Sequence, residues 1–253
     1  MTAFARWSAI AAFALAILAG LLATLAGPGY ATETVGLPTA FAMLRYATLI
    51  GGAAAVLGLA AIVLRFVFKA RSPRLAYPVL AVIVGAVVVV QIANFRAQAQ
   101  ANPLHDVTTD LDNPPAFAAI APRAYDTGRT AYDERAKAAA HPHPDWRQTH
   151  ADLYEDIKPA KLSGSVAEAL ERAQAAGTAM GWEIVAQDPA TGLLEATATT
   201  GWFAFKDDVV VRATDLGDGT VRVDARSVSR IGVSDVGANA ARLRDFLGRL
   251  SAE

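Results

Sequence analysis

The sequence predicts an α+β protein in two parts: a block of three transmembrane helices, and a soluble domain with an antiparallel sheet of about four strands flanked by two helices. Two observations predict this division. The mean hydropathy is +0.29, and the apolar residues concentrate before Gln98 in runs that are nearly free of charge. After Gln98 the chain carries helical and strand patterns separated by short polar turns.

The charges divide at the same place. The first 97 residues hold seven Lys or Arg against one acidic residue, whereas the remainder holds 16 against 23. Nucleic-acid affinity comes mainly from clustered Lys and Arg, so an acidic second part argues against a nucleic-acid partner. The chain has no cysteine, which excludes disulfides, thiolate metal sites and a cysteine nucleophile.

Three apolar segments have the length that crosses a bilayer, because about 20 residues span a hydrocarbon core of ~30 Å. The expected spans are residues 7–26, 47–65 and 75–95 of a membrane block that covers residues 1–97. Gly27-Pro28-Gly29 is expected to end the first helix. The pairs Gly51/Ala55 and Ala54/Gly58 predict close helix packing. No span has an internal Asp, Glu, Lys or His, which favours an anchor in the lipid bilayer over a transporter.

The first segment has an alternative interpretation. Arg6 precedes it and Thr24-Leu25-Ala26 resembles a cleavage site, as in a secretory signal peptide. The apolar stretch is longer than that of a typical signal peptide, which favours a membrane span.

The loops predict the orientation. The loop between the second and third spans holds Lys69, Arg71 and Arg74, whereas the loop between the first and second holds Glu33 and no basic residue. Positively charged loops stay in the cytoplasm. We therefore expect a bacterial inner-membrane protein with its N-terminus inside and its C-terminal domain outside the cytoplasm.

Residues 98–161 form an approach segment rich in Pro and Ala, which is expected to lack long regular elements. His141 and His143 lie in it and are weak candidates for a metal site, because a His-x-His pair can bind zinc. Prolines separate the two histidines, so a linker is the favoured interpretation, and no cofactor is expected.

Residues 162–253 carry the pattern of the folded core. Ser165 and Glu168 predict a capping box, and the helix that follows is expected to end at Gly181. Four strands and a closing helix follow at residues 182–187, 193–205, 208–214, 220–229 and 236–250. Short turns between the strands predict antiparallel pairing, with the helices on one face.

Several motifs of this region resemble a bacterial family catalogued as domain of unknown function 1499. They include Leu104-His105-Asp106-Val107-Thr108-Thr109-Asp110, Gly181-Trp182-Glu183-Ile184-Val185, Phe205-Lys206-Asp207-Asp208-Val209-Val210-Val211-Arg212 and Asp224-Ala225-Arg226-Ser227-Val228-Ser229-Arg230. The resemblance covers residues 104–250. The family carries no established activity, so the resemblance implies one domain with these boundaries and no mechanism.

The polar residues of these motifs form the candidate ligand site: Asp208, Arg226, Arg230, Ser234, Asp235 and Asn239. A five-residue turn with Thr214 opposite Thr220 would place Asp208 opposite Arg226. The functional interpretation is a site for a small anion or another polar ligand, built from Arg226, Arg230 and the start of the last helix at Ser234 and Asp235. The structural interpretation is a solvated ladder of ion pairs beside a helix cap.

Two functions remain open at this point. The favoured one is a non-enzymatic domain of the cell envelope that binds a protein partner or a small ligand. The alternative is an envelope enzyme that uses the cluster of Asp208, Arg226, Arg230 and Asp235. An enclosed pocket lined by the cluster would favour a ligand site or an enzyme, and a flat surface would favour a protein partner.

The orientation can be tested with single cysteines, because the chain has none of its own. In intact spheroplasts, a membrane-impermeant maleimide should label Thr220→Cys and leave Ser72→Cys unlabelled. Lysed spheroplasts, in which both positions should react, provide the control. Labelling of position 72 alone in intact spheroplasts would reverse the orientation.

Overall fold

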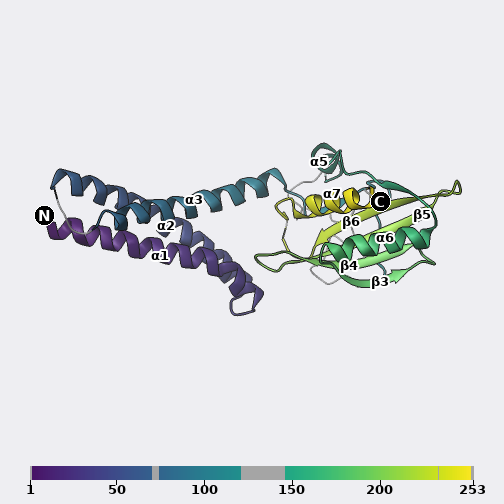
Figure 1. The fold of residues 1–253 in the computed structure, drawn as a ribbon, viewed down its shortest axis with the longest axis horizontal. Helices are drawn as coiled ribbons and strands as arrows, with labels where there is room; N and C mark the ends of the chain where they lie inside the picture. Colours follow the sequence, from purple (N-terminus) through teal and green to yellow (C-terminus); the bar gives the residue numbers. More distant parts are fainter. Residues whose placement is uncertain (1, 70–73, 121–145, 233, 252–253) are drawn as a thin grey trace. The chain divides into compact units, whose positions relative to one another are not determined.

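The computed structural model describes residues 2–69, 74–120, 146–232 and 234–251 (Figure 1). The chain divides into two compact units. The first comprises Met1–Ala97 together with Trp202–Ala204, and the second comprises Gln98–Gly201 and Phe205–Glu253.

The first unit consists of apolar helices. They are α1 (Thr2–Ala31), α2 (Leu37–Val67) and α3 (Ala76–Ala101), whose last residues belong to the second unit. All three are long and apolar enough to cross a membrane. Each helix extends beyond the span predicted for it.

Small residues allow these helices to approach closely, as the sequence predicts. Gly51, Ala54 and Gly58 are buried along α2. A Cβ atom on Gly58 would lie 2.8 Å from the carbonyl oxygen of Pro78 in α3, and one on Gly85 would collide with the carbonyl oxygen of Gly51. Backbone therefore packs against backbone where α2 crosses α3.

The expected helix end at Gly27-Pro28-Gly29 is wrong, because α1 continues to Ala31 with Pro28 inside it. Proline lacks an N–H donor, but its carbonyl still accepts a hydrogen bond, here from the N–H of Thr32 at 2.9 Å. The helix ends where Glu33 adopts a left-handed conformation with φ of 58°.

The second unit contains a six-stranded antiparallel sheet in the order β1-β6-β5-β4-β3, with β2 also paired to β6. The strands are β1 (Asp106–Thr108), β2 (Ala160–Ser163), β3 (Glu183–Asp188), β4 (Leu193–Thr199), β5 (Lys206–Asp215) and β6 (Thr220–Ser229). The last four are the predicted meander. β1 lies within the approach segment and β2 at the end of it. Both strands pair with the edge of β6 that is not paired with β5.

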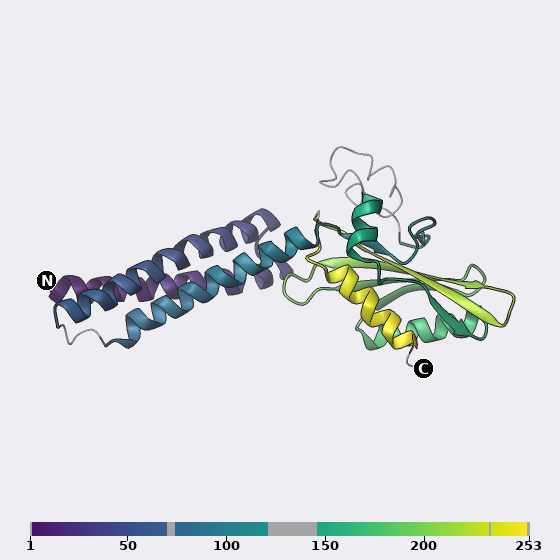
Figure 2. The ribbon, with the colours of Figure 1, turned by 90° about the horizontal axis from the view of Figure 1, so that it is seen from above.

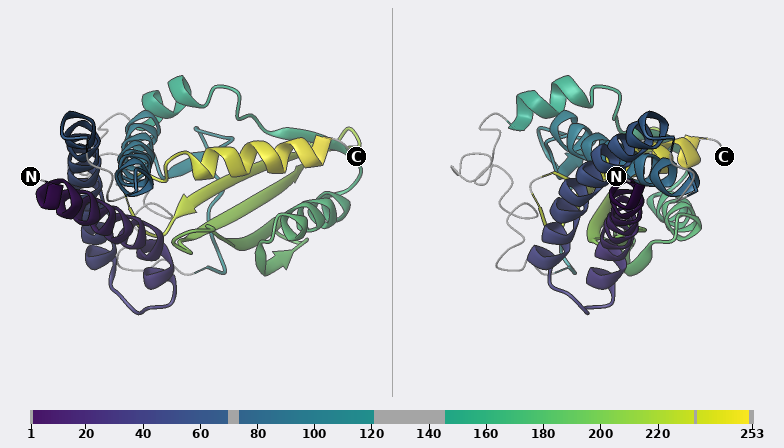
Figure 3. Two further views of the ribbon diagram at one scale, coloured as in Figure 1. Left: turned by 60° about the vertical axis from the view of Figure 1, so that its left-hand side comes forward. Right: turned by 90° about the vertical axis from the view of Figure 1, so that its left-hand side faces the viewer.

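Two helices cover one face of the sheet, α6 (Val166–Ala179) and α7 (Ala238–Ser251), as Figures 1 and 3 show. They enclose the main core, which includes Leu170, Leu194, Val223, Leu243 and Phe246. Ser165 and Glu168 form the predicted capping box at the start of α6. The α+β fold class is confirmed.

The strand expected to run to Phe205 ends earlier. β4 stops at Thr199, and the N–H of Thr200 donates to the carbonyl oxygen of Phe205 across a short loop. The chain therefore turns between β4 and β5 in place of bending within one long strand.

A short helix, α5 (Trp146–Leu153), packs beside the sheet (Figure 2) and contacts β1 through His150. The backbone N–H of Thr108 donates a hydrogen bond to Nε2 of His150 at 3.0 Å, in place of an acceptor on another strand. A side chain thus satisfies a backbone donor that an open sheet edge would leave unpaired.

Candidate functional site

The face of the sheet opposite α6 and α7 carries half of the predicted site. Backbone register brings alternate residues of four strands onto this face, which we call the polar face. Its charged residues are Asp106, Glu195, Lys206, Asp208, Arg212, Arg222, Asp224 and Arg226. Most are buried, so the expected solvated ladder is wrong: the side chains pair with each other and are covered by another part of the chain.

Residues 111–120, which we call the cover segment, lie over the polar face. Phe117 and Ile120 pack against Val210 and Val228. The carboxylate of Glu195 accepts hydrogen bonds from three successive backbone N–H groups, those of residues 118, 119 and 120, at 2.5, 2.8 and 2.6 Å. The buried charge of Glu195 is thereby bound by backbone dipoles.

Arg226 forms the most deeply buried ion pair among the described residues. Its Nε donates to Oδ1 of Asp106 at 2.9 Å and its Nη2 donates to Oδ2 at 2.7 Å, in a bidentate geometry. The side chains are only 3% and 4% exposed. Nη1 also donates to the carbonyl oxygen of Pro115 in the cover segment.

Asp208 lies opposite Val228, so its predicted position opposite Arg226 is wrong. The turn is centred one residue later than expected, because Thr214 pairs with Arg222 in place of Thr220, and Asp215 pairs with Val221. The shift by two positions keeps Asp208 on the predicted face but gives it Arg230 as its partner. Arg230 binds it through Nε and Nη2 at 2.9 and 2.8 Å.

A second group of charges lies toward the other end of β6. Asp224 accepts hydrogen bonds from Arg212 and Arg222, and both arginines also contact Asp110 just after β1. The hydroxyl of Thr109 donates to Asp224 as well. These contacts tie the start of the cover segment to the sheet.

The remaining predicted site residues lie at the N-terminal end of α7. Asp235 accepts hydrogen bonds from the N–H groups of Gly237 and Asn239 at 2.7 and 2.6 Å, as a cap does. Burial raises the pKa of Asp235 to about 6, although these N–H groups oppose the shift. Ser234 donates to the carbonyl oxygen of Asn102.

Asn239 is buried and connects this end of α7 to the sheet. Its Nδ2 donates to the carbonyl oxygen of His105 and to Oγ of Ser229, and its Oδ1 accepts from Ser227 and Arg242. The structure therefore separates the six predicted residues into two groups: Asp208, Arg226 and Arg230 around the polar face, and Ser234, Asp235 and Asn239 at α7.

Arg242 completes the second group and was absent from the sequence prediction. Its Nη1 donates to Ser227 at 2.9 Å and to Asn239 at 2.5 Å, and its Nη2 donates to Asp207 at 2.6 Å. The side chain is 10% exposed. One feature of the sequence could have indicated the role of Arg242. Asp207 alternates onto the core face of β5, where a buried carboxylate needs a cationic partner.

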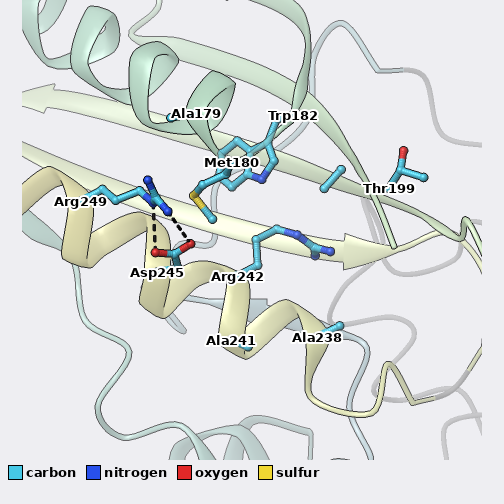
Figure 4. Close-up of a pocket in the computed structure, with 10 residues that line it drawn as sticks. Ala179, Met180, Trp182, Thr199, Ala238, Ala241, Arg242, Asp245 and Arg249 are labelled. Atoms are coloured by element: carbon cyan, nitrogen blue, oxygen red, sulfur yellow. Dashed lines mark hydrogen bonds and ion pairs between the residues drawn. The ribbon is translucent and has the colours of Figure 1, made fainter. Parts of the chain in front are cut away.

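Arg242 lines a groove of about 600 Å³ between the C-terminal end of α6, the end of β4 and α7 (Figure 4). We call it the α6/α7 groove. Its lining residues are Ala179, Met180, Trp182, Ala198, Thr199, Ala238, Ala241, Arg242, Asp245 and Arg249. Figure 4 shows Arg249 and Asp245 paired at one end and Arg242 nearer to Thr199.

A second cleft, of about 650 Å³, lies beside α5. Its wall includes Thr108, Asp110, His150, Tyr154 and Arg222. Burial lowers the pKa of His150 to about 4, although Asp106 opposes the shift. His150 is thus neutral near pH 7. Because Nε2 accepts from Thr108, the proton is assigned to Nδ1.

The histidines His141 and His143 lie outside the described residues. Within the described parts of the chain, no group of three or more His, Asp or Glu side chains gathers in a way that could hold a metal ion.

The fold and its sites define a class of protein: an α+β domain joined to helices that are long and apolar enough to cross a membrane. The family described as "Protein of unknown function (DUF1499)" matches residues 106–250, and the chain belongs to this family. This finding confirms the resemblance seen in the motifs. A search of curated proteins gave no match to the chain.

The buried pair of Arg226 and Asp106 should contribute strongly to stability. Arg226→Ala leaves the carboxylate of Asp106 buried without its partner, so we expect a loss of about 3–5 kcal/mol in the free energy of unfolding. Lys161→Ala is the control, because the pair of Lys161 and Asp218 is exposed and such pairs contribute about 0–1 kcal/mol. Denaturant unfolding of the full chain in detergent micelles measures both. Equal losses would contradict this assignment.

His150 should make the domain less stable in acid. Unfolding restores the ordinary pKa of 6.5 from about 4. The unfolded chain therefore binds a proton that the folded chain does not, and stability falls as the pH decreases from about 6.5 to 4, by about 3 kcal/mol. His150→Gln keeps an acceptor for Thr108 and should show a shallower loss in melts across this range.

Asp235 shifts stability the other way, because its raised pKa favours the folded state as the pH falls below about 6. The contribution of Asp235 to stability is the same in the wild type and in His150→Gln, so it cancels when their pH-dependent stabilities are compared. Parallel curves for the wild type and His150→Gln would refute the effect of His150.

Proposed function

We propose that this chain is a membrane-anchored protein of the bacterial cell envelope that binds a partner protein or a small ligand in the α6/α7 groove. The three apolar helices support the anchor. The basic loop between the second and third helices supports an orientation in the inner membrane with the N-terminus in the cytoplasm and the C-terminal domain outside it.

The groove is the observation that carries the proposal. Its volume of about 600 Å³ lies within the range of about 300–1,000 Å³ that ligand sites occupy. It combines an apolar surface from Met180, Trp182 and Ala241 with charged groups at both ends, which is the usual composition of a binding site.

The alternative of an envelope enzyme based on the Asp/Arg cluster has less support. Arg226 and Arg230 each bind a carboxylate through two N–H groups. An anionic substrate would have to displace Asp106 or Asp208 from these pairs. Neither the groove nor the cleft beside α5 is lined by Asp208, Arg226, Arg230 or Asp235.

Site-specific photo-crosslinking in native membranes tests the groove. A benzophenone amino acid at position 241, which lines the groove, should form an adduct, and the mass of the adduct tells a protein from a small molecule. The same probe at position 175, an exposed alanine of α6 outside the groove, is the control. Adding Ala238→Leu should suppress the adduct by filling the groove. Equal adducts at both positions, or none, would count against the proposal.

A further inference from the structure

We infer that the α6/α7 groove accepts an uncharged, extended peptide segment with small apolar side chains, in which a backbone carbonyl oxygen accepts hydrogen bonds from Arg242. The inference rests on the proposed function and names the chemical class of the occupant. Hydrogen-bond capacity, charge and length each support it.

Hydrogen-bond capacity identifies the contact. A guanidinium has five N–H donors. Arg242 uses three of them, on Ser227, Asn239 and Asp207. Among the described residues, Nε–H and one hydrogen of Nη2 have no acceptor. A side chain that is only 10% exposed and lines a groove is therefore held rigidly with two donors available to an occupant.

The charges argue against an anion. Asp207 already neutralises Arg242, and Asp245 neutralises Arg249 at the other end of the groove. The chain after residue 97 carries 23 acidic residues against 16 Lys or Arg, so its long-range field repels anions. A neutral acceptor such as an amide carbonyl takes the two donors without adding charge.

The length of the groove suits a short extended segment. Arg242 and Arg249 lie two turns apart on α7, a rise of ~10 Å at 1.5 Å per residue. Three residues of extended chain cover that distance at ~3.3 Å each. Ala238 and Ala241, which precede Arg242 on α7, line the groove together with Met180 and Trp182. These short and apolar lining residues favour small or branched apolar side chains in an occupant.

Equilibrium dialysis of the full chain in lipid nanodiscs tests the inference with radiolabelled acetyl-Ala-Leu-Ala-amide. Its counterpart with a free C-terminal carboxylate and decanoate are the anionic comparisons, and empty nanodiscs correct for partition into lipid. We expect the amide to bind at least tenfold more tightly than either anion. Equal or tighter binding of an anion would overturn the inference.

Three variants locate the binding. Ala241→Leu fills the groove and should weaken amide binding at least tenfold, whereas the matched Ala175→Leu on the exposed face of α6 should leave it unchanged. Arg242→Lys keeps the charge beside Asp207 but loses the planar pair of donors. Arg242→Lys should weaken amide binding several-fold. The melting temperature of the same variant shows whether the fold is retained. Unchanged binding in Ala241→Leu would refute the site.

The two proposals fail differently. A groove-specific photo-adduct at position 241 without any amide binding would overturn the peptide class and leave the groove as a binding site. Absence of both the adduct and amide binding would overturn the groove as a binding site altogether.

Discussion

The burial of charged side chains on the second face of the sheet constrains the rest of the domain. Asp106 and Arg226 are almost fully buried, and either charge alone would cost several kcal/mol at that depth. Their bidentate pair therefore holds β1 against β6, although β1 has only three residues. Since β1 leads into the cover segment, the same pair helps to place Asn113 and Pro115, whose carbonyls accept hydrogen bonds from Arg212 and Arg226.

Features that depend on residues close together in the chain could be predicted from the sequence. The capping box of α6 involves Ser165 and Glu168, three positions apart, and β6 has the predicted bounds of Thr220 and Ser229. The spacing of Gly51, Ala54 and Gly58 indicated close helix packing for the same reason. Each signal arises from local hydrogen bonding or from one face of one element.

Features that depend on distant residues could not be predicted. Alternating charges on β6 are typical of a solvated face, and only the cover segment, about 110 positions earlier in the chain, makes that face an interior. Arg242 is a second example of a residue whose role depends on a distant partner. Helical spacing puts it off the apolar face of α7, and its pairing with Asp207, 35 positions away, determines its role. The position of the turn sets the partner of Asp208, and in this turn the backbone N–H groups of Gly217 and Thr220 donate hydrogen bonds to the carboxylates of Asp215 and Asp218.

The position of Arg242 also links the stability of the fold to the proposed binding. An arginine free in solvent loses side-chain entropy when it binds an acceptor, whereas Arg242 is already fixed by Ser227, Asn239 and Asp207. Its two available donors are therefore held in set directions, and in the proposed binding this hydrogen-bond geometry would add to the selectivity that the charges give. Arg244 and Arg249, on the same helix, have side chains that are 45% exposed and bind single surface carboxylates. The buried network of which Arg242 is part distinguishes it from these two, and it would preorganise the donors that the proposed binding in the groove uses.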